Sequence, residues 1–286
     1  MSTVPEERIV RLLDADADLA ERIDVERRAA ARSELLARTV SLAPGTDAGE
    51  ALSQRWSGAR SLLLLDGIVG RATLLGGTTT VQLLGAGDLL EIPDDAFASG
   101  LVPVAISWAV LETTTVALLD EALMQRTQRW PELLTALFDR VSAQSLRLGT
   151  HCAISSLARV EDRIETLLWF LAERWGRIGS DGVVLPLRLT HETLGQMLGA
   201  KRPTVSLALK QLAADGLVER RGDGAWLLRR EWQDAPVAAE SAGGGVLRIA
   251  PLPDDSPAPA GELRVSDRRR PPARAHRTRA AAAARR

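Results

Sequence analysis

Hydrogen-bond donors suited to nucleic acid are concentrated in one short stretch of the sequence. Arg202 carries a guanidinium fork that can bind the O6 and N7 atoms of a guanine at the same time. Ser206 and Leu207 follow at a helical spacing, and they can reach a base edge and a thymine methyl group. Thr204 and Lys210 suit phosphates, which position a helix without reading sequence. The pattern predicts a surface that binds double-stranded DNA.

A predicted β-hairpin extends this surface. Residues 217–220 and 225–228 form two apolar runs around a turn that contains two glycines. Such a wing would place Arg220 and Arg221 beside the DNA backbone, where binding weakens as salt is added. The full set of candidate DNA-binding residues is Lys201, Arg202, Pro203, Thr204, Ser206, Leu207, Lys210, Arg220 and Arg221.

A helix-turn-helix would position these side chains. Thr190 is suited to cap the first helix, and Gly199 ends that helix and permits a tight turn. The second helix begins near Arg202, with Pro203 in its first turn, where a missing N–H costs nothing. Two short helices joined by a glycine-containing turn are the signature of the motif. The residues expected to pack the two helices together are Leu194, Met197, Leu198, Val205, Ala208, Leu209 and Leu212.

The rest of the chain divides into segments that differ in composition and in the spacing of their apolar residues. Residues 5–40 are predicted to be helical, because apolar residues recur there at helical spacing. From residue 62 to 116, short Val- and Thr-rich stretches alternate with glycine-containing turns, which favours a small antiparallel sandwich or barrel. Trp130-Pro131 begins a long predicted helix, and another helix spans about residues 157–175.

The long predicted helix carries a narrow apolar stripe. Its members are Leu134, Leu137, Val141, Leu148 and Cys152. A stripe of this length suits a coiled-coil partner, and a single helix-turn-helix reads too few base pairs for genomic specificity. We therefore expect a homodimer that binds an inverted repeat with half-sites about one helical turn apart. The alternative is that the stripe packs on the protein's own β region.

Composition excludes several classes of protein. The apolar runs are too short to span a bilayer and the acidic N-terminus is no secretory signal, so we expect a cytoplasmic protein with no membrane partner. Cys152 is the single cysteine, which excludes a disulfide framework or a four-cysteine metal site within one chain. The formal net charge is −1, although residues 264–286 hold nine arginines and one acid. That tail is predicted to be disordered, and it is expected to add non-specific DNA affinity.

Catalytic motifs are missing from the sequence. It contains no Gly-x-Ser-x-Gly elbow, no His-Glu-x-x-His pair, no Walker loop and no dinucleotide fingerprint. A solvated loop explains the acidic group of Glu91, Asp94 and Asp95. We expect no enzyme activity and no metal site. The alternative function is a ligand-sensing or protein-interaction module whose winged helix does not bind DNA specifically.

The stretch from Leu189 to Val205, LTHETLGQMLGAKRPTV, resembles the helix-turn-helix of the Crp/Fnr family of bacterial transcriptional regulators. The segment from Leu84 to Leu90 is similar to the glycine turn that precedes the ligand cassette of that family. The resemblance implies an α+β fold with an N-terminal cyclic-nucleotide-binding-like β-roll, a long dimerisation helix and a C-terminal winged helix-turn-helix. It also makes RNA polymerase a candidate partner.

The β region departs from the family members that bind cyclic nucleotides. Glu91-Ile92 replaces their Gly-Glu pair, and no Arg or Lys occurs from Ala72 to Gln125 to pair with a cyclic phosphate. A buried phosphate needs such a cation to offset its desolvation, so we expect no cyclic nucleotide in the standard mode. Iron–sulfur sensing needs several cysteines, and a lone histidine such as His151 is more often structural than a haem ligand. No cofactor is therefore expected.

The recognition helix also differs from that of the best-known cyclic-AMP receptors. Arg202 and Thr204 are retained, whereas Pro203 and Leu207 stand at positions that are charged there. We expect the operator to share at most part of the usual half-site. The predicted domains are a helical segment (1–50), the β-roll (51–128), the dimerisation helix (129–156), the winged helix-turn-helix (157–234) and a disordered tail (235–286).

Overall fold

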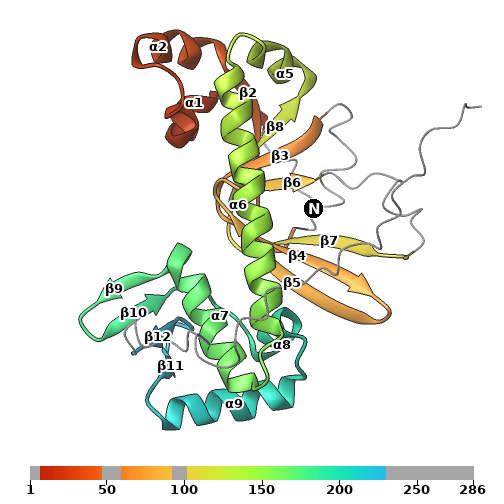
Figure 1. The fold of residues 1–286 in the computed structure, drawn as a ribbon, viewed down its shortest axis with the longest axis vertical. Coiled ribbons are helices and arrows are strands. Elements are labelled where there is room, and N and C mark those ends of the chain that lie inside the picture. The colour runs from red at the N-terminus through yellow and green to blue at the C-terminus, as the bar shows by residue number, and fades with distance from the viewer. Residues whose placement is uncertain (1–6, 47–58, 92–101, 230–286) are drawn as a thin grey trace, which may run out of the picture. The chain divides into compact units, whose positions relative to one another are not determined.

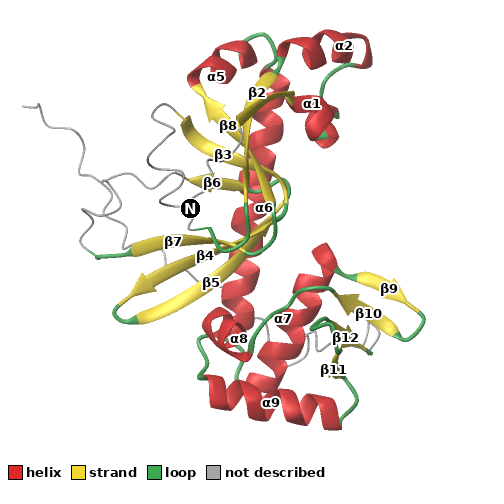
Figure 2. Ribbon diagram, turned by 180° about the vertical axis from the view of Figure 1, so that it is seen from behind, coloured by secondary structure: helices red, strands yellow, loops and turns green. Residues whose placement is uncertain are grey.

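A computed structural model describes residues 7–46, 59–91 and 102–229 of the chain (Figures 1 and 2). The predicted tail and the acidic residues Asp94 and Asp95 lie outside the described residues. The elements, in chain order, are β1 (Glu7–Arg11), α1 (Leu12–Ala15), η1 (Ala17–Ala20), α2 (Val25–Glu34), β2 (Leu36–Leu42), β3 (Ala59–Asp66), β4 (Ile68–Leu75), β5 (Thr78–Gly85), β6 (Leu89–Glu91), β7 (Ala105–Val110), β8 (Thr114–Asp120), α5 (Glu121–Thr127), α6 (Pro131–Ser155), α7 (Val160–Trp175), β9 (Arg177–Gly179), β10 (Gly182–Leu185), α8 (His191–Leu198), α9 (Arg202–Ala214), β11 (Val218–Arg220) and β12 (Trp226–Leu228).

Two antiparallel sheets form the β region. One has the strand order β1-β2-β8-β3-β6, and the other has the order β5-β4-β7. Side chains from both sheets, including Leu62, Leu64, Val69, Trp108 and Val116, share one buried core. The alternation of apolar and polar residues along these strands places one face of each sheet in that core. The prediction of a small antiparallel sandwich or barrel is confirmed, and the two sheets make it a sandwich.

The prediction of helices throughout residues 5–40 is wrong at both ends. Glu7–Arg11 and Leu36–Leu42 are strands, and β2 pairs with β8 so that Val40 lies opposite Val116. Thr39 and Val40 are β-branched and buried. Pairing with β8 therefore outweighs any helical preference of this segment, because buried β-branched residues suit a sheet. The Ala- and Arg-rich stretch just before it does form helix α2. The sheet thus begins before the boundary predicted at residue 51.

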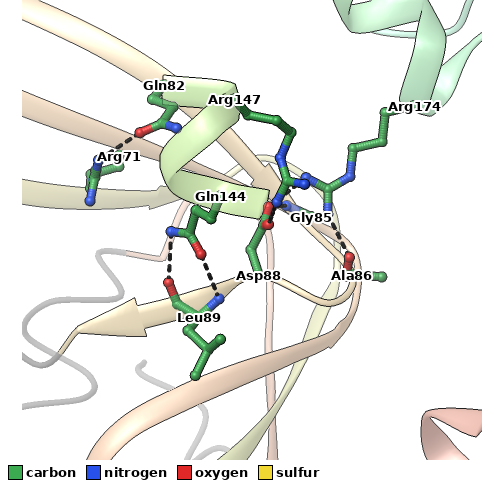
Figure 3. A network of polar contacts seen from close by, with 9 residues as sticks. All are labelled: Arg71, Gln82, Gly85, Ala86, Asp88, Leu89, Gln144, Arg147 and Arg174. Carbon is green, nitrogen blue, oxygen red and sulfur yellow. Dashed lines mark hydrogen bonds and ion pairs between the residues drawn. The ribbon is translucent and has the colours of Figure 1, made fainter. Parts of the chain in front are cut away.

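Helix α6 begins at Pro131 as predicted, and strands β3 to β8 lie to one side of it in both views (Figures 1 and 2). Gln144 accepts a hydrogen bond from the Leu89 N–H at 3.0 Å and donates to the Leu89 carbonyl at 3.1 Å (Figure 3). Leu137 is buried among side chains of the N-terminal segment and the sheet, so its predicted place in a stripe that faces a coiled-coil partner is wrong, and the alternative of packing within the subunit holds for this residue. Phe138, which is 70% exposed, is the outward residue of that turn.

Helices α7, α8 and α9 pack with the sheet β11-β12-β10-β9. Their shared core includes Leu167, Leu194, Val205, Leu212 and Trp226. The apolar stripes of the three helices face that core, so the outer face of α9 is left for solvent. Within the described ranges, no helix combines the length and apolar character needed to cross a bilayer.

Candidate nucleic-acid interface

Local signals set the first helix of the motif where the sequence predicts it. The Thr190 hydroxyl accepts a hydrogen bond from the Thr193 N–H at 3.0 Å and so caps α8. Gly199 ends the helix in the left-handed conformation, with a φ of 63°. Leu194 and Leu198 are buried between these ends. The cap, the inward face and the glycine stop are confirmed.

The turn between α8 and α9 depends on a second glycine, Gly195, which no local sequence pattern marks as special. The Ala200 N–H donates to the Gly195 carbonyl at 2.9 Å, which folds the chain back against the helix. A Cβ atom on Gly195 would lie only 2.5 Å from the Ala200 carbonyl oxygen. Two backbone segments approach so closely here that a side chain cannot fit. The tight turn that sets the position of α9 relative to α8 therefore requires glycine at residue 195.

The outer face of α9 presents cationic and apolar groups to solvent. Arg202, Thr204 and Lys210 are exposed, and the Leu207 side chain is 70% exposed. The helix contains no acidic residue, and Lys201 precedes it directly. Exposed basic groups at the N-terminal end of a helix attract phosphate, and the helix dipole adds to that attraction. Pro203 is exposed in the first turn, as predicted.

Ser206 connects the two helices of the motif. Its hydroxyl lies 2.8 Å from Nδ1 of His191 and donates to the Arg202 carbonyl at 3.0 Å. Partial burial, and then the positive charges of Arg220 and Arg202, lower the pKa of His191 below its usual value. The imidazole is therefore neutral at pH 7, and the contact with Ser206 is a neutral hydrogen bond between α8 and α9.

The predicted wing is a short hairpin of β11 and β12. The Arg221 N–H donates to the Ala225 carbonyl and the Gly224 N–H donates to the Arg221 carbonyl, both at 2.9 Å. Asp223 also accepts from the Ala225 N–H at 3.0 Å, which tightens the turn. These bonds leave Arg221 exposed at the tip. Arg221 can therefore reach toward a DNA backbone beside α9.

The structure places Arg220 differently from Arg221. Its guanidinium donates to the Leu189 carbonyl at 3.1 Å and lies 4.9 Å from the centre of the Trp226 ring. This side chain therefore ties the wing to the residue just before the cap of α8. The Arg188 side chain lies next to Gly224, since a Cβ atom built on that glycine would be 3.3 Å from Arg188 Cγ. Arg188 is also exposed, so it adds a cation beside the wing turn. No sequence pattern indicated Arg188, because its neighbours in the chain are apolar.

Known proteins are similar to this chain both in the helix-turn-helix region and over a longer part of its length. A family model of the Crp-like helix-turn-helix domain matches residues 162–232. The regulatory protein CysR of Synechococcus elongatus is 26% identical over 170 residues, which are 58% of this chain and 74% of that protein. A CooA mutant structure from Carboxydothermus hydrogenoformans has a TM-score of 0.54 at 19% identity, covering 68% of this chain and 84% of that one. FixK2 from Bradyrhizobium japonicum has a TM-score of 0.52 at 18% identity, covering 69% and 94%.

The capped helix pair, its cationic outer face and the hairpin define a winged helix-turn-helix protein that binds DNA. The two structural likenesses show that the β region has the corresponding β-roll fold. The matched Crp-like domain and the related regulator show that the chain is a DNA-binding transcriptional regulator whose helix-turn-helix is of the Crp-like type. The predicted fold class and resemblance are confirmed.

Proposed function

We propose that the protein binds an inverted-repeat operator as a homodimer, with Arg202 reading a guanine in each half-site. The exposed cationic face of α9 carries this proposal, because Arg202 stands at the tip of a helix whose opposite face is buried. Leu207 packs on a thymine methyl group, and Lys201, Thr204, Lys210 and Arg221 bind phosphates. Pro203 stiffens the first turn and so fixes the angle at which the helix enters the groove.

Two residues receive a positioning role in this proposal. The Ser206 hydroxyl is engaged by His191 and by the Arg202 carbonyl, so it orients the base-reading turn. The Arg220 guanidinium is engaged by Leu189 and Trp226, so it orients the wing. Both side chains still lie next to the DNA-facing surface. The Arg220 guanidinium has further N–H groups that can donate to a phosphate while it keeps its present partners, whereas the single Ser206 hydroxyl proton is already donated to the Arg202 carbonyl.

Selection of bound duplexes from a random pool, followed by fluorescence anisotropy, tests the base-reading role. An inverted repeat should be enriched. Arg202→Ala should weaken its binding by about thirtyfold or more, because each of the two half-sites loses a contact worth about 1–3 kcal/mol. The matched control is Arg11→Ala, because Arg11 is an exposed arginine of the β-roll. Unchanged affinity of Arg202→Ala would remove the base-reading assignment.

The salt dependence of binding separates this function from the alternative of a winged helix that binds protein. A DNA-binding surface that neutralises phosphates gives a linear fall of log K with log salt. Lys210→Gln should reduce that slope by about two, one for each subunit of the dimer, and should weaken binding to all sequences equally. A flat salt dependence would favour the protein-interaction module.

The dimer is supported by a row of exposed apolar side chains along α6. Leu134, Phe138, Val141 and Leu148 follow one another at steps of four, three and seven residues, and all of them are exposed. That spacing continues to Cys152, which is also exposed. Alternating steps of three and four place side chains on the seam of a coiled coil, and the second copy would cover them. We name this row the α6 seam.

Analytical ultracentrifugation tests the α6 seam. Phe138→Glu combined with Val141→Glu should convert dimers to monomers and weaken operator binding. Thr150→Glu is the control, because Thr150 is exposed on the same helix about half a turn away from the seam residue Leu148. A seam variant that remains dimeric would place the interface elsewhere. Leu137 is unsuitable for this test, because it is buried within the subunit.

Two further parts of the proposal concern partners. The β-roll is proposed not to bind cyclic AMP in the standard mode, since residues 72–125 supply no cation for the phosphate. Isothermal titration with cyclic AMP tests this. Saturable binding of cyclic AMP would contradict the proposal. RNA polymerase is proposed as the partner at the promoter, and transcription in vitro from the selected operator tells activation from repression.

A further inference from the structure

A cavity of about 500 Å³ lies where the glycine turn after β5 meets α6, α7 and α8. Its wall includes the polar side chains of Arg147, Arg174 and His151 and the aromatic rings of Phe170 and Trp175. A volume in this range suits a small organic ligand, and an apolar wall with a few polar groups is typical of ligand sites. We name this space the junction cavity.

Two guanidinium groups of the junction cavity, those of Arg147 and Arg174, converge on one carboxylate (Figure 3). The Asp88 side chain is completely buried; it accepts hydrogen bonds from Arg147 and, at 2.5 Å, from Arg174. The Gly85 N–H also donates to Asp88, at 2.9 Å. Two guanidinium cations share a single carboxylate here, so this cluster retains one positive charge. The two arginine side chains are 35% and 25% exposed, which leaves part of each facing the cavity.

The other charged groups around the junction cavity do not cancel that charge. Arg140 also lines the cavity, and it is already paired with Asp16 at 2.7 Å. Asp18 and Glu173 contribute to the lining, but both are exposed to solvent. Water screens exposed carboxylates much more strongly than half-buried guanidinium groups. The inner part of the wall therefore favours an anion.

His151 supplies a hydrogen-bonding atom without a partner. The residue is only 9% exposed, and its Nε2 atom has no hydrogen-bond partner among the described residues. Burial lowers the pKa of the ring, while a hydrogen bond to the Met197 carbonyl opposes this shift. The ring is thus neutral at pH 7, and Nε2 can accept a hydrogen bond when the ring proton is on Nδ1. A buried acceptor without a donor costs free energy, which a ligand N–H or O–H would recover.

We propose that the junction cavity binds a small organic anion, a carboxylate or phosphate ester that has a flat apolar body and a hydrogen-bond donor. The anionic group binds Arg147 and Arg174, which can chelate two oxygens of a carboxylate or phosphate. The donor binds Nε2 of His151. The apolar body stacks against Phe170 and Trp175, both of which line the cavity.

The junction cavity also contacts the DNA-binding motif. Met197 lines it from the last turn of α8, and its carbonyl is held by His151 and, at 3.3 Å, by the Ser155 hydroxyl of α6. An occupant therefore touches the side chains that attach α8 to α6. Occupancy changes the affinity for operator DNA through this contact; this second part rests on the DNA binding proposed above.

The anion and ring contacts are tested first without DNA, using three probes that share a naphthalene ring system and differ in charge. These are 1-naphthyl phosphate, the neutral 1-naphthol and the cation 1-naphthylmethylammonium, each titrated into the full-length protein by calorimetry. The phosphate should bind at least tenfold more tightly than the other two. Equal binding of the neutral probe, or preferred binding of the cation, would overturn the proposal.

Variants of the cavity wall then locate the bound probe. Arg147→Met should weaken naphthyl phosphate binding at least tenfold. Arg147→Lys, which keeps the charge but loses the two-donor fork, should weaken it less, and the exposed Arg159→Met should leave it unchanged. Because Arg147 also holds Asp88, Ala143→Phe provides an independent test: Ala143 lines the cavity and is exposed, so the larger side chain fills part of the space while the residues of the ion pairs are unchanged. Full binding by both Ala143→Phe and Arg147→Met would overturn the site.

The coupling is tested by measuring the affinity for naphthyl phosphate with and without saturating operator duplex. Because coupling is reciprocal, a ligand that alters DNA affinity must itself bind differently when DNA is present. At least a threefold change is expected, and His151→Phe should reduce it. If the probe binds equally well with and without DNA, the regulatory part is refuted and the binding site stands. Failure to bind any duplex would refute the proposed function instead.

Discussion

Gly195→Ala is the substitution from which the structure gives the sharpest expectation. A Cβ atom at residue 195 would lie 2.5 Å from the Ala200 carbonyl oxygen, whereas ordinary contacts begin at 3.4 Å. The turn must therefore open by about 0.9 Å, and the obstacle is backbone that no side-chain rotation can move. Overpacking of this kind costs about 1–3 kcal/mol of folding free energy.

The same displacement moves the base-reading end of α9, because Arg202 follows Ala200 by only two residues. A bidentate contact to guanine is worth about 1–3 kcal/mol and depends on alignment of both hydrogen bonds. We therefore expect the operator dissociation constant to rise about tenfold to a hundredfold for Gly195→Ala. Fluorescence anisotropy at one fixed salt concentration measures this, with urea denaturation of the same samples to confirm that they are folded.

Two other glycines supply the matched controls. Gly199→Ala places a side chain at a φ of 63° with nothing within 4 Å, so it should cost about 1–2 kcal/mol of stability without moving α9. Gly149→Ala fills open space in the middle of α6 and should stabilise that helix by about 0.5–1 kcal/mol. A folded Gly195→Ala protein with operator affinity within about twofold of the parent would refute the steric reasoning.

Three further predictions concern stability. Burial lowers the pKa of His151 in the folded protein, so as the pH falls below about 6.5 the unfolded chain takes up the His151 proton first. The folded protein therefore loses stability toward acid. The urea midpoint should fall between pH 7.5 and pH 5.5, and the fall should be larger for the parent protein than for His151→Gln. Asp88→Asn removes the carboxylate that two arginines share. Because both arginines still reach water, the free energy of unfolding should fall by about 1–3 kcal/mol, which is less than for a fully buried pair. An unchanged urea midpoint would contradict the shared ion pair. Leu212→Ala should cost about 2–5 kcal/mol because the side chain is buried, whereas Leu207→Ala should change stability by less than about 0.5 kcal/mol and weaken operator binding; equal stability losses would reverse the assigned faces of α9.

The helix-turn-helix could be predicted because its signals are local. The cap at Thr190, the left-handed stop at Gly199 and the proline in the first turn of α9 all act within a few residues of where they stand. The strands of the β region were also predictable, because alternating apolar residues and glycine turns recur there at close spacing.

Segments whose conformation depends on distant partners were misassigned. Strand β2 follows a helical stretch and becomes a strand because β8 lies beside it. Leu137 fits the apolar stripe of α6 by spacing, yet the N-terminal segment covers it and leaves Phe138 exposed instead. Periodicity shows which residues share a face of a helix, but it does not show what covers that face.

The sequence by itself determined that this protein has a winged helix-turn-helix with Arg202 at its cationic tip, because capping, turn formation and helical periodicity are short-range properties. The tertiary structure decided which cations face solvent and which hold the fold: Arg221 stands at the wing tip, while Arg220 is turned onto Trp226. It also decided that Arg147 and Arg174 meet at Asp88 and line one cavity, since residues far apart in the chain approach only when the sheets and helices pack.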